Sequence, residues 1–309
     1  MTAIQTSSIR TILVALIAIL ICVPAVLHAS PYSDAVNALN PDAYYRGDEG
    51  SGAPQDTTAN GHHMDNYFTN TYAGGPTAGD GLPGMDAANG AYQFTGPQVA
   101  RSGEGATQYL PALGQDPRTV IAWVNLDTDR ATLGGAHNIW QWGLDFGGAN
   151  TFTAWSLFIE TGWDPGTNAA TGFDAATLNI QGRQIQALDT PINVGDWHMI
   201  AIGFEGDGTA PLGDAMIWID GALQTNIVQD TVAVPNTGGT NGPALGFRLG
   251  QAVGGFGANA RVDHVSVHTE KLSGVAIQGL WDAANIPEPA SCALLGIAAL
   301  LLGSMRRRA

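Results

Sequence analysis

The sequence predicts an all-β protein in which two antiparallel sheets pack face to face. Arg118–Leu126, Trp197–Phe204 and Asp214–Ile219 are largely apolar on both alternating faces, as expected for strands inside a stacked pair of sheets. Asp220-Gly221 ends the last of these runs and signals a tight hairpin turn, because both central residues of such a turn need positive φ. The 309-residue chain is long enough for one large sandwich.

The remaining strands are expected in order along the chain, separated by polar turns. They span Pro41–Glu49, Ala91–Gly96, Ile139–Phe146, Ala154–Glu160, Leu178–Gly182, Leu245–Gly250 and Arg261–Thr269. Strict alternation in the last strand would place Val262 and His264 on one face and Asp263 and Val265 on the other. About twelve strands then form one sandwich, without an internal repeat or a second domain.

Two long segments are expected to be loops, and one segment is expected to be a helix. Thr71–Asn89 is rich in Gly, Pro and Asp, and Gly162–Asp174 carries the aromatic residues Trp163 and Phe173 in a similar setting. Leu272–Ala284 has apolar residues at helical spacing and is predicted to close the domain as a short helix.

The charge balance of the chain excludes some classes of partner. The formal net charge is −15, and residues 30–286 contain 26 acidic and 8 basic residues. Such an excess of acid argues against nucleic acid and anionic membrane surfaces as partners. It is compatible with cation binding or with solubility outside the cell.

The N-terminus reads as a secretory signal over residues 1–29. Arg10 supplies a positive charge, Thr11–Val23 is an apolar run, and Ala29 ends the segment with a small residue. Cleavage after Ala29 would leave residues 30–41 as a linker. The alternative is an uncleaved membrane anchor.

The C-terminal segment, residues 286–309, contains three features in a fixed order. Pro287, Glu288 and Pro289 are followed by an apolar run over Cys292–Leu302 and then by Arg306, Arg307 and Arg308. This arrangement resembles the PEP-CTERM sorting signal of bacteria. The prolines prevent a helix from continuing through the triplet, and the arginines favour the cytoplasmic side of a membrane. The alternative is an ordinary C-terminal membrane tail.

The sorting-signal resemblance implies a processing route. An exosortase-type protease would cut near the Pro-Glu-Pro triplet after a transient stay in the inner membrane, and the domain would reach the cell surface or the extracellular space. Cys22 and Cys292 are the only cysteines, and both lie in segments that would be removed. The mature domain would then have no disulfide, and its stability would depend on its core.

Several short motifs resemble the laminin-G-like, concanavalin A-type jelly roll. Gly195-Asp196-Trp197-His198 precedes a strand that ends in Asp220-Gly221, and Tyr45–Gly52 is similar to the opening of that family. The resemblance covers residues 42–285 and implies a two-sheet jelly-roll sandwich. That fold carries lectins, glycosidases and adhesion modules alike, so it does not by itself identify a function.

The same resemblance implies one structural calcium ion between the first loop and the last strand. The matching positions are Asp48, Glu49, Asn60 and Asp263, whose oxygen atoms are the ligand type that calcium prefers. The alternative is that Asp48 and Asn60 only cap turns.

Exposed aromatic residues are the candidates for a glycan site. Trp163, Phe173 and Tyr72 are placed in predicted loops, where they would either bind a sugar or pack the loop onto the sandwich. No catalytic residue is predicted, because the chain lacks the paired carboxylates on alternate strand positions that jelly-roll glycosidases use. Glu160, close to Trp163, is an isolated acid.

We therefore expect an exported, non-catalytic surface or matrix protein that binds an extracellular polysaccharide or another surface component. The alternative is a glycoside hydrolase or lyase on the same fold. A third possibility is a purely structural role without a specific ligand.

Overall fold

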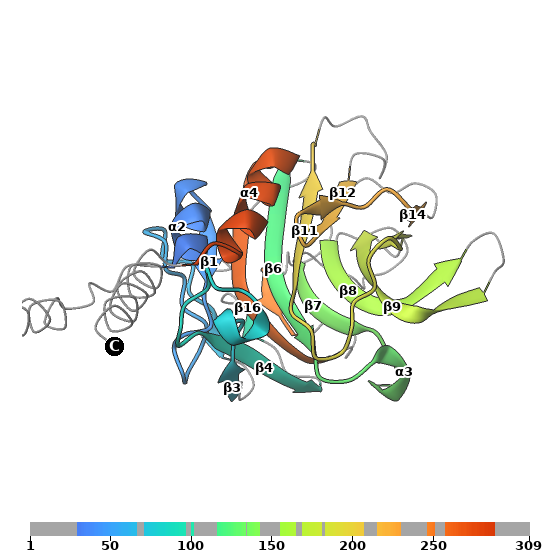
Figure 1. The fold of residues 1–309 in the computed structure, drawn as a ribbon, viewed down its shortest axis with the longest axis horizontal. Coiled ribbons are helices and arrows are strands. Elements are labelled where there is room, and N and C mark those ends of the chain that lie inside the picture. Colours follow the sequence, from blue (N-terminus) through green and yellow to red (C-terminus); the bar gives the residue numbers. More distant parts are fainter. Residues whose placement is uncertain are drawn as a thin grey trace, which may run out of the picture.

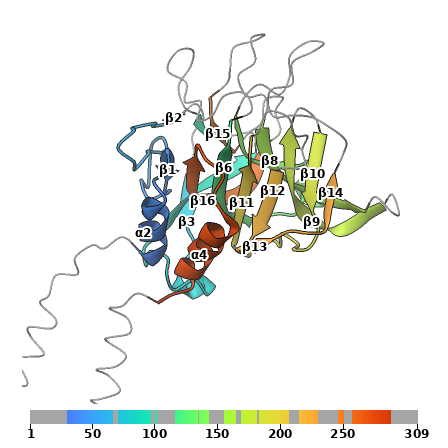
Figure 2. The ribbon, with the colours of Figure 1, turned by 90° about the horizontal axis from the view of Figure 1, so that it is seen from above.

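The computed structural model describes eleven stretches of the chain. They are residues 30–66, 71–96, 100–101, 116–133, 135–142, 155–164, 169–180, 183–206, 215–229, 246–250 and 257–287. These residues form two antiparallel sheets packed as a sandwich, with two helices on one side (Figures 1 and 2). The two-sheet jelly-roll class predicted from the sequence is confirmed.

Sheet A has eight strands. In spatial order they are β13 (Ala222–Leu223), β12 (Ala215–Ile219), β11 (His198–Phe204), β6 (Arg118–Leu126), β16 (Ala258–His268), β4 (Gly90–Gly96) and β3 (Thr71–Gly74), with β1 (Ala43–Tyr45) also paired to β16. Sheet B also has eight strands. They are β14 (Ile227–Gln229), β10 (Arg183–Ala187), β9 (Ala169–Ile180), β8 (Trp155–Asp164), β7 (His137–Trp142), β15 (Arg248–Leu249), β5 (Ala100–Arg101) and β2 (Asp65–Asn66).

Alternation along the central strands builds two apolar layers. In β6, Val120, Ala122 and Val124 face the core between the sheets, whereas Ile121 and Trp123 face the opposite side. The same division holds in β12, where the sequence predicted both faces correctly. Sheet A is therefore apolar on its outer face too, and this face needs its own cover.

Two helices cover the outer face of sheet A. They are α2 (Pro31–Ala38) and α4 (Gly274–Ala284), which lie beside each other in Figures 1 and 2. Trp123 stacks on Trp281 of α4 with a 5.7 Å centroid separation and meets Tyr32 of α2 edge-on at 5.6 Å. The predicted closing helix is confirmed.

The prediction of a linker over residues 30–41 was wrong. Ser30 caps α2 by accepting a hydrogen bond from the Ser33 amide, and Tyr32 and Val36 are completely buried. The segment is short and carries only a few apolar residues, so its amphipathic pattern is weak in sequence. Packing against Trp123 stabilises it as a helix.

A bulge in β16 overturns the predicted alternation of that strand. The pairing with β6 shifts between Asp263 and Ser266, and His264 has a φ of 47°. Val262 and Val265 consequently face the same core, whereas strict alternation placed them on opposite faces. The extra residue turns His264 away from the core and toward Ser33 of α2.

Two segments predicted as loops contain strands. β8 continues to Asp164 and β9 begins at Ala169, so Gly162–Asp174 belongs to a long hairpin in which Thr161 pairs with Asp174. β3 likewise occupies the start of Thr71–Asn89 and pairs with β4. Glycine-rich composition suggested loops, but cross-strand pairing in the sheet overrides that local tendency.

The predicted terminal signals lie almost entirely outside the described residues. The leader at residues 1–29 lies outside them. Of the sorting motif, Pro287 is the last residue described, and the residues outside are Glu288, Pro289, Arg306, Arg307 and Arg308. Within the described ranges, no helix combines the length and apolar character needed to cross a membrane.

The role of α2 can be tested by truncating its buried tyrosine. Tyr32→Ala is expected to reduce the free energy of unfolding by about 3–5 kcal/mol, because it removes an aromatic side chain packed on Trp123. Asn37→Ala, at an exposed position of the same helix, is the control and should change stability by less than about 0.5 kcal/mol. Urea denaturation followed by tryptophan fluorescence measures both, and equal small effects would show that α2 is only loosely attached.

Candidate functional site

Asp263, one of the four predicted calcium ligands, is completely buried and surrounded by hydrogen-bond donors. Its Oδ2 accepts from the amide of Asn89 at 2.7 Å and lies 2.7 Å from Nδ1 of His264, while its Oδ1 accepts from the backbone N–H of His264 at 2.7 Å. The carboxylate thus has protein partners on both oxygens.

The other three predicted ligands have separate partners. Asp48 pairs with Arg46 at 2.8 Å and accepts from the backbone N–H of Gly90 at 3.0 Å, a residue distant in the chain at the start of β4. Glu49 accepts from the backbone N–H of Gln55 at 2.8 Å, and the side-chain amide of Asn60 donates to the carbonyl of Asp42 at 2.9 Å. In the part of the chain that the structure describes, no group of three or more His, Cys, Asp or Glu residues could hold a metal ion. These residues do not fit the implied calcium site.

Asp263 instead belongs to a buried network that connects β16 to α2. His264, held by Asp263, places its Nε2 3.3 Å from Oγ of Ser33, which in turn lies 3.2 Å from the hydroxyl of Tyr44. We call Asp263, His264 and Ser33 the Asp263 cluster. Its connectivity is that of acid, base and nucleophile in a hydrolase, but all three residues are 0% exposed, so no substrate reaches the serine. The cluster joins the helix to the sheet.

Burial has a direct electrostatic effect on this cluster. It raises the pKa of Asp263 from 3.8 to about 6, although charge and hydrogen bonds from His264 oppose the shift, and nearby Asp48 adds to it. The folded protein therefore binds a proton at Asp263 more tightly than the unfolded chain does.

Tyr72, a predicted ligand-binding residue, packs against the sandwich. Its ring meets Tyr92 edge-on at 5.6 Å, and its hydroxyl donates to the carbonyl of Gly52 at 3.0 Å. Burial and the neighbouring carboxylate of Glu49 raise the pKa of its phenol. For Tyr72 the packing alternative is therefore the better description.

Phe173, in contrast, borders a cavity. The ring is partly exposed on β9 beside a hollow of about 300 Å³ whose polar lining includes Asp129, Asp174 and Asn193. We call this hollow the Phe173 pocket. Trp163 belongs to β8 of the same hairpin, opposite Ala170, and its side chain lies outside the described part.

Four separate segments line the Phe173 pocket, and one of them contributes Thr161 of β8. Asp129 stands before α3 (Arg130–Leu133) and accepts from the backbone N–H of Thr132 at 2.6 Å. Asp174 belongs to β9, and its carbonyl accepts from the N–H of Ile192, which fixes the loop that carries Asn193. Nothing in the sequence joins these segments, so Asp129, Asp174 and Asn193 were not predicted.

Glycine makes room for the aromatic ring. Gly162 lies at the register shift of β8, and a methyl group there would collide with the hydroxyl of Thr171 and sit 3.3 Å from Cε2 of Phe173. A side chain at this position would displace the ring or the threonine.

The pocket is acidic at neutral pH. Hydrogen bonds from Thr132 lower the pKa of Asp129, so this carboxylate is ionised and accepts hydrogen bonds. Behind it, burial lowers the pKa of His137, an effect that the nearby Asp174 partly opposes. A partly exposed ring beside carboxylate and amide groups can stack on the apolar face of a ligand while the polar groups bind its hydroxyls.

Glu160, the isolated acid noted in the sequence, has an amide as its hydrogen-bond partner rather than a second carboxyl group. Its Oε1 accepts from the amide of Gln186 on β10 at 3.3 Å. Glu160 lies on β8 and Gln186 on β10, so this side-chain contact reaches across β9, which pairs with both strands.

No protein-family model and no curated protein matches the sequence. Among solved structures, the chain is similar to domain 4 of AbnA, a GH43 extracellular arabinanase from Geobacillus stearothermophilus solved in complex with arabinotriose. The TM-score is 0.50 and the identity 15%, with 78% of this chain and 97% of that chain covered. This likeness supports the sandwich fold.

Two further structures match at lower similarity. The binding domain of Paraclostridial Mosquitocidal Protein 1 has a TM-score of 0.48 and 11% identity, covering 79% of this chain and 52% of that chain. Trypanosoma rangeli sialidase has a TM-score of 0.42 and 11% identity, covering 77% of this chain and 32% of that chain. This chain thus spans about half or less of those two proteins.

The raised pKa of Asp263 predicts a defined pH dependence. Between pH 3.8 and about 6 the folded state keeps a proton that the unfolded state has lost, so stability should fall as the pH rises through this window. The contribution is on the order of 3 kcal/mol at 1.36 kcal/mol per pKa unit. Urea denaturation of the wild type and of Asp263→Asn at several pH values isolates it. A pH-independent difference between the two proteins would contradict the assignment.

The protein partners of the predicted calcium ligands imply that chelation does not change the thermal stability. Adding EDTA is expected to leave the melting temperature unchanged, because Asp263 and Asp48 are already held by protein donors. A decrease of more than about 4 °C that added calcium reverses would instead reveal a bound cation worth on the order of 1 kcal/mol.

Proposed function

We propose that this chain is a non-catalytic carbohydrate-binding protein whose ligand is an extracellular polysaccharide or surface glycan. The observation that carries the proposal is the Phe173 pocket, in which a partly exposed ring borders a cavity lined by Asp129, Asp174 and Asn193. Its volume of about 300 Å³ is at the small end of ligand sites. Aromatic faces bind the apolar C–H face of a sugar, and ionised carboxylates accept from its hydroxyls.

Export is a second part of the proposal and rests on the two ends of the sequence. Residues 1–29 have the three regions of a secretory signal, and residues 286–309 have the order of a PEP-CTERM signal. Together they support a route through the inner membrane, with cleavage by an exosortase-type protease and delivery to the cell surface or beyond. Recovery of mature protein that still carries Arg306–Arg308 would contradict this route.

A hydrolase is the second candidate, because two carboxylates, Asp129 and Asp174, line the same pocket. A glycosidase needs one carboxyl group to donate a proton, which requires a raised pKa. Hydrogen bonds from Thr132 lower the pKa of Asp129, and this favours binding over catalysis. Release of reducing sugar from a bound polysaccharide, lost in Asp129→Asn, would favour the hydrolase instead.

The binding role can be tested on the full chain with arabinotriose and a panel of other neutral oligosaccharides. The arabinanase domain with the same fold was solved with arabinotriose, which makes that sugar a reasonable first probe. Phe173→Ala should weaken binding by about tenfold or more, equivalent to about 1.4 kcal/mol, as measured by calorimetry.

Tyr72→Ala is the matched control. Tyr72 is also a partly exposed aromatic, but it borders neither the Phe173 pocket nor its lining residues. Its loss should leave binding unchanged, with the melting temperature of both variants measured to confirm folding. Equal losses in both variants, or no binding of any glycan by the wild type, would reject this site.

A further inference from the structure

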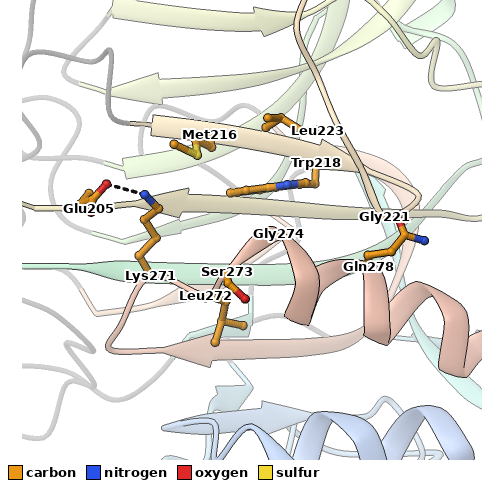
Figure 3. A pocket seen from close by; sticks show the side chains of 10 residues that line it. All are labelled: Glu205, Met216, Trp218, Gly221, Leu223, Lys271, Leu272, Ser273, Gly274 and Gln278. Atoms are coloured by element: carbon orange, nitrogen blue, oxygen red, sulfur yellow. Dashed lines mark hydrogen bonds and ion pairs between the residues drawn. The ribbon is translucent and has the colours of Figure 1, made fainter.

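A hollow of about 610 Å³ lies on the outer face of sheet A, between β12–β13 and the start of α4 (Figure 3). Trp218 and Leu272 are almost buried in its lining. The ion pair that lines it joins Lys271 to Glu205 within the chain, as the dashed line in Figure 3 shows. The hollow therefore presents no unpaired charge among its described lining residues, and reactive chemistry lies elsewhere in the fold.

Two Asn-Gly pairs lie in the part of the chain that the structure describes, Asn60-Gly61 and Asn89-Gly90. In such a pair the backbone nitrogen of glycine can attack the side-chain amide carbon of asparagine. The new C–N bond closes a cyclic succinimide, and the amide nitrogen leaves as ammonia. Water then opens the ring to aspartate or isoaspartate, so amide and water become acid and ammonia. Asparagine is a thermolabile residue for this reason.

The tertiary structure controls how fast each pair reacts. Glycine has no Cβ to shield its backbone nitrogen, so the pair is reactive wherever the backbone is free. A hydrogen bond from the glycine N–H holds the attacking nitrogen in place, and burial excludes the water that opens the ring. The same dipeptide is therefore labile in an exposed turn and stable in a buried strand.

Asn60-Gly61 meets the conditions for reaction. Both residues are exposed and lie outside the strands. Within the described residues, the backbone N–H of Gly61 donates no hydrogen bond. Gly61 has a φ of 70°, and a Cβ at this position would approach only Nε2 of His63, at 3.9 Å. Open space thus surrounds the attacking nitrogen.

Asn89-Gly90 is held on both sides of the bond that would form. Asn89 is 6% exposed, and its side-chain amide donates to Oδ2 of Asp263 at 2.7 Å and to the carbonyl of Pro76 at 3.0 Å. The N–H of Gly90 donates to Oδ1 of Asp48 at 3.0 Å, and Gly90 begins β4. The contacts that hold the buried Asp263 carboxylate therefore also fix this pair.

We propose that Asn60 is a site of spontaneous deamidation in the folded protein, and that the fold protects Asn89 from the same reaction. The substrate is the chain itself, and water is the only co-reactant. The proposal does not depend on glycan binding.

Deamidation of Asn60 would change the contacts at the start of β1. The side-chain amide of Asn60 donates to the carbonyl of Asp42 at 2.9 Å and lies 3.4 Å from its Oδ1. Asp42 in turn donates its backbone N–H to the carbonyl of Val267 on β16. A carboxylate at position 60 has no N–H to donate and would face two oxygen atoms of Asp42. The product should therefore be less stable than the original chain.

Peptide mass spectrometry of the full chain, incubated at mildly alkaline pH in heavy-oxygen water, tests the proposal. In the folded protein Asn60 should convert at least about tenfold faster than Asn89, a difference of about 1.4 kcal/mol in the barrier. In concentrated guanidinium both pairs should convert at similar rates, because only the shared dipeptide chemistry remains. Asn60 that stays intact in the folded chain, or Asn89 that converts as fast, overturns the proposal.

Two substitutions test the expected effect of the product. Asn60→Ala removes only the donor, whereas Asn60→Asp also places a negative charge against Asp42. Asn60→Asp should therefore lower the melting temperature further than Asn60→Ala does. Because Asn60 is exposed, both variants should fold. Equal melting temperatures would contradict the expected repulsion.

Discussion

Burial of Trp123 between Tyr32 and Trp281 is the contact on which the arrangement of this molecule depends. The outer face of sheet A is apolar, and an uncovered face of that kind would cost about 25 cal/mol for each Å² left in water. The chain covers it with helices from its two ends, α2 and α4, which are brought together although they are more than 200 residues apart.

The bulge in β16 serves the same arrangement. By adding one residue, it turns His264 out of the core and toward Ser33 of α2, where His264 and Asp263 form a buried polar connection. The position that the family resemblance implies for calcium is therefore used to hold a helix. A buried polar network of this kind is costly unless every member is paired, and it favours one docking geometry over others. Helix and bulge thus depend on each other.

The Phe173 pocket combines a ring with carboxylate and amide groups, which suits a ligand rich in hydroxyls. Its lining residues come from separate segments of the chain, so the shape of the pocket depends on the folded sheet.

Local patterns in the sequence determined the central strands of sheet A, the faces of β6 and β12, the turn at Asp220-Gly221 and the helix α4. These features are predictable because strand alternation and helical spacing depend on near neighbours only. Tertiary packing decided the rest. The β16 bulge, the helix α2 and the β8–β9 hairpin each depend on a partner distant in the chain. The candidate site shows the same dependence on distant partners. The aromatic residue Phe173 could be predicted from the sequence, but its polar neighbours come from segments that only the folded sheet brings together.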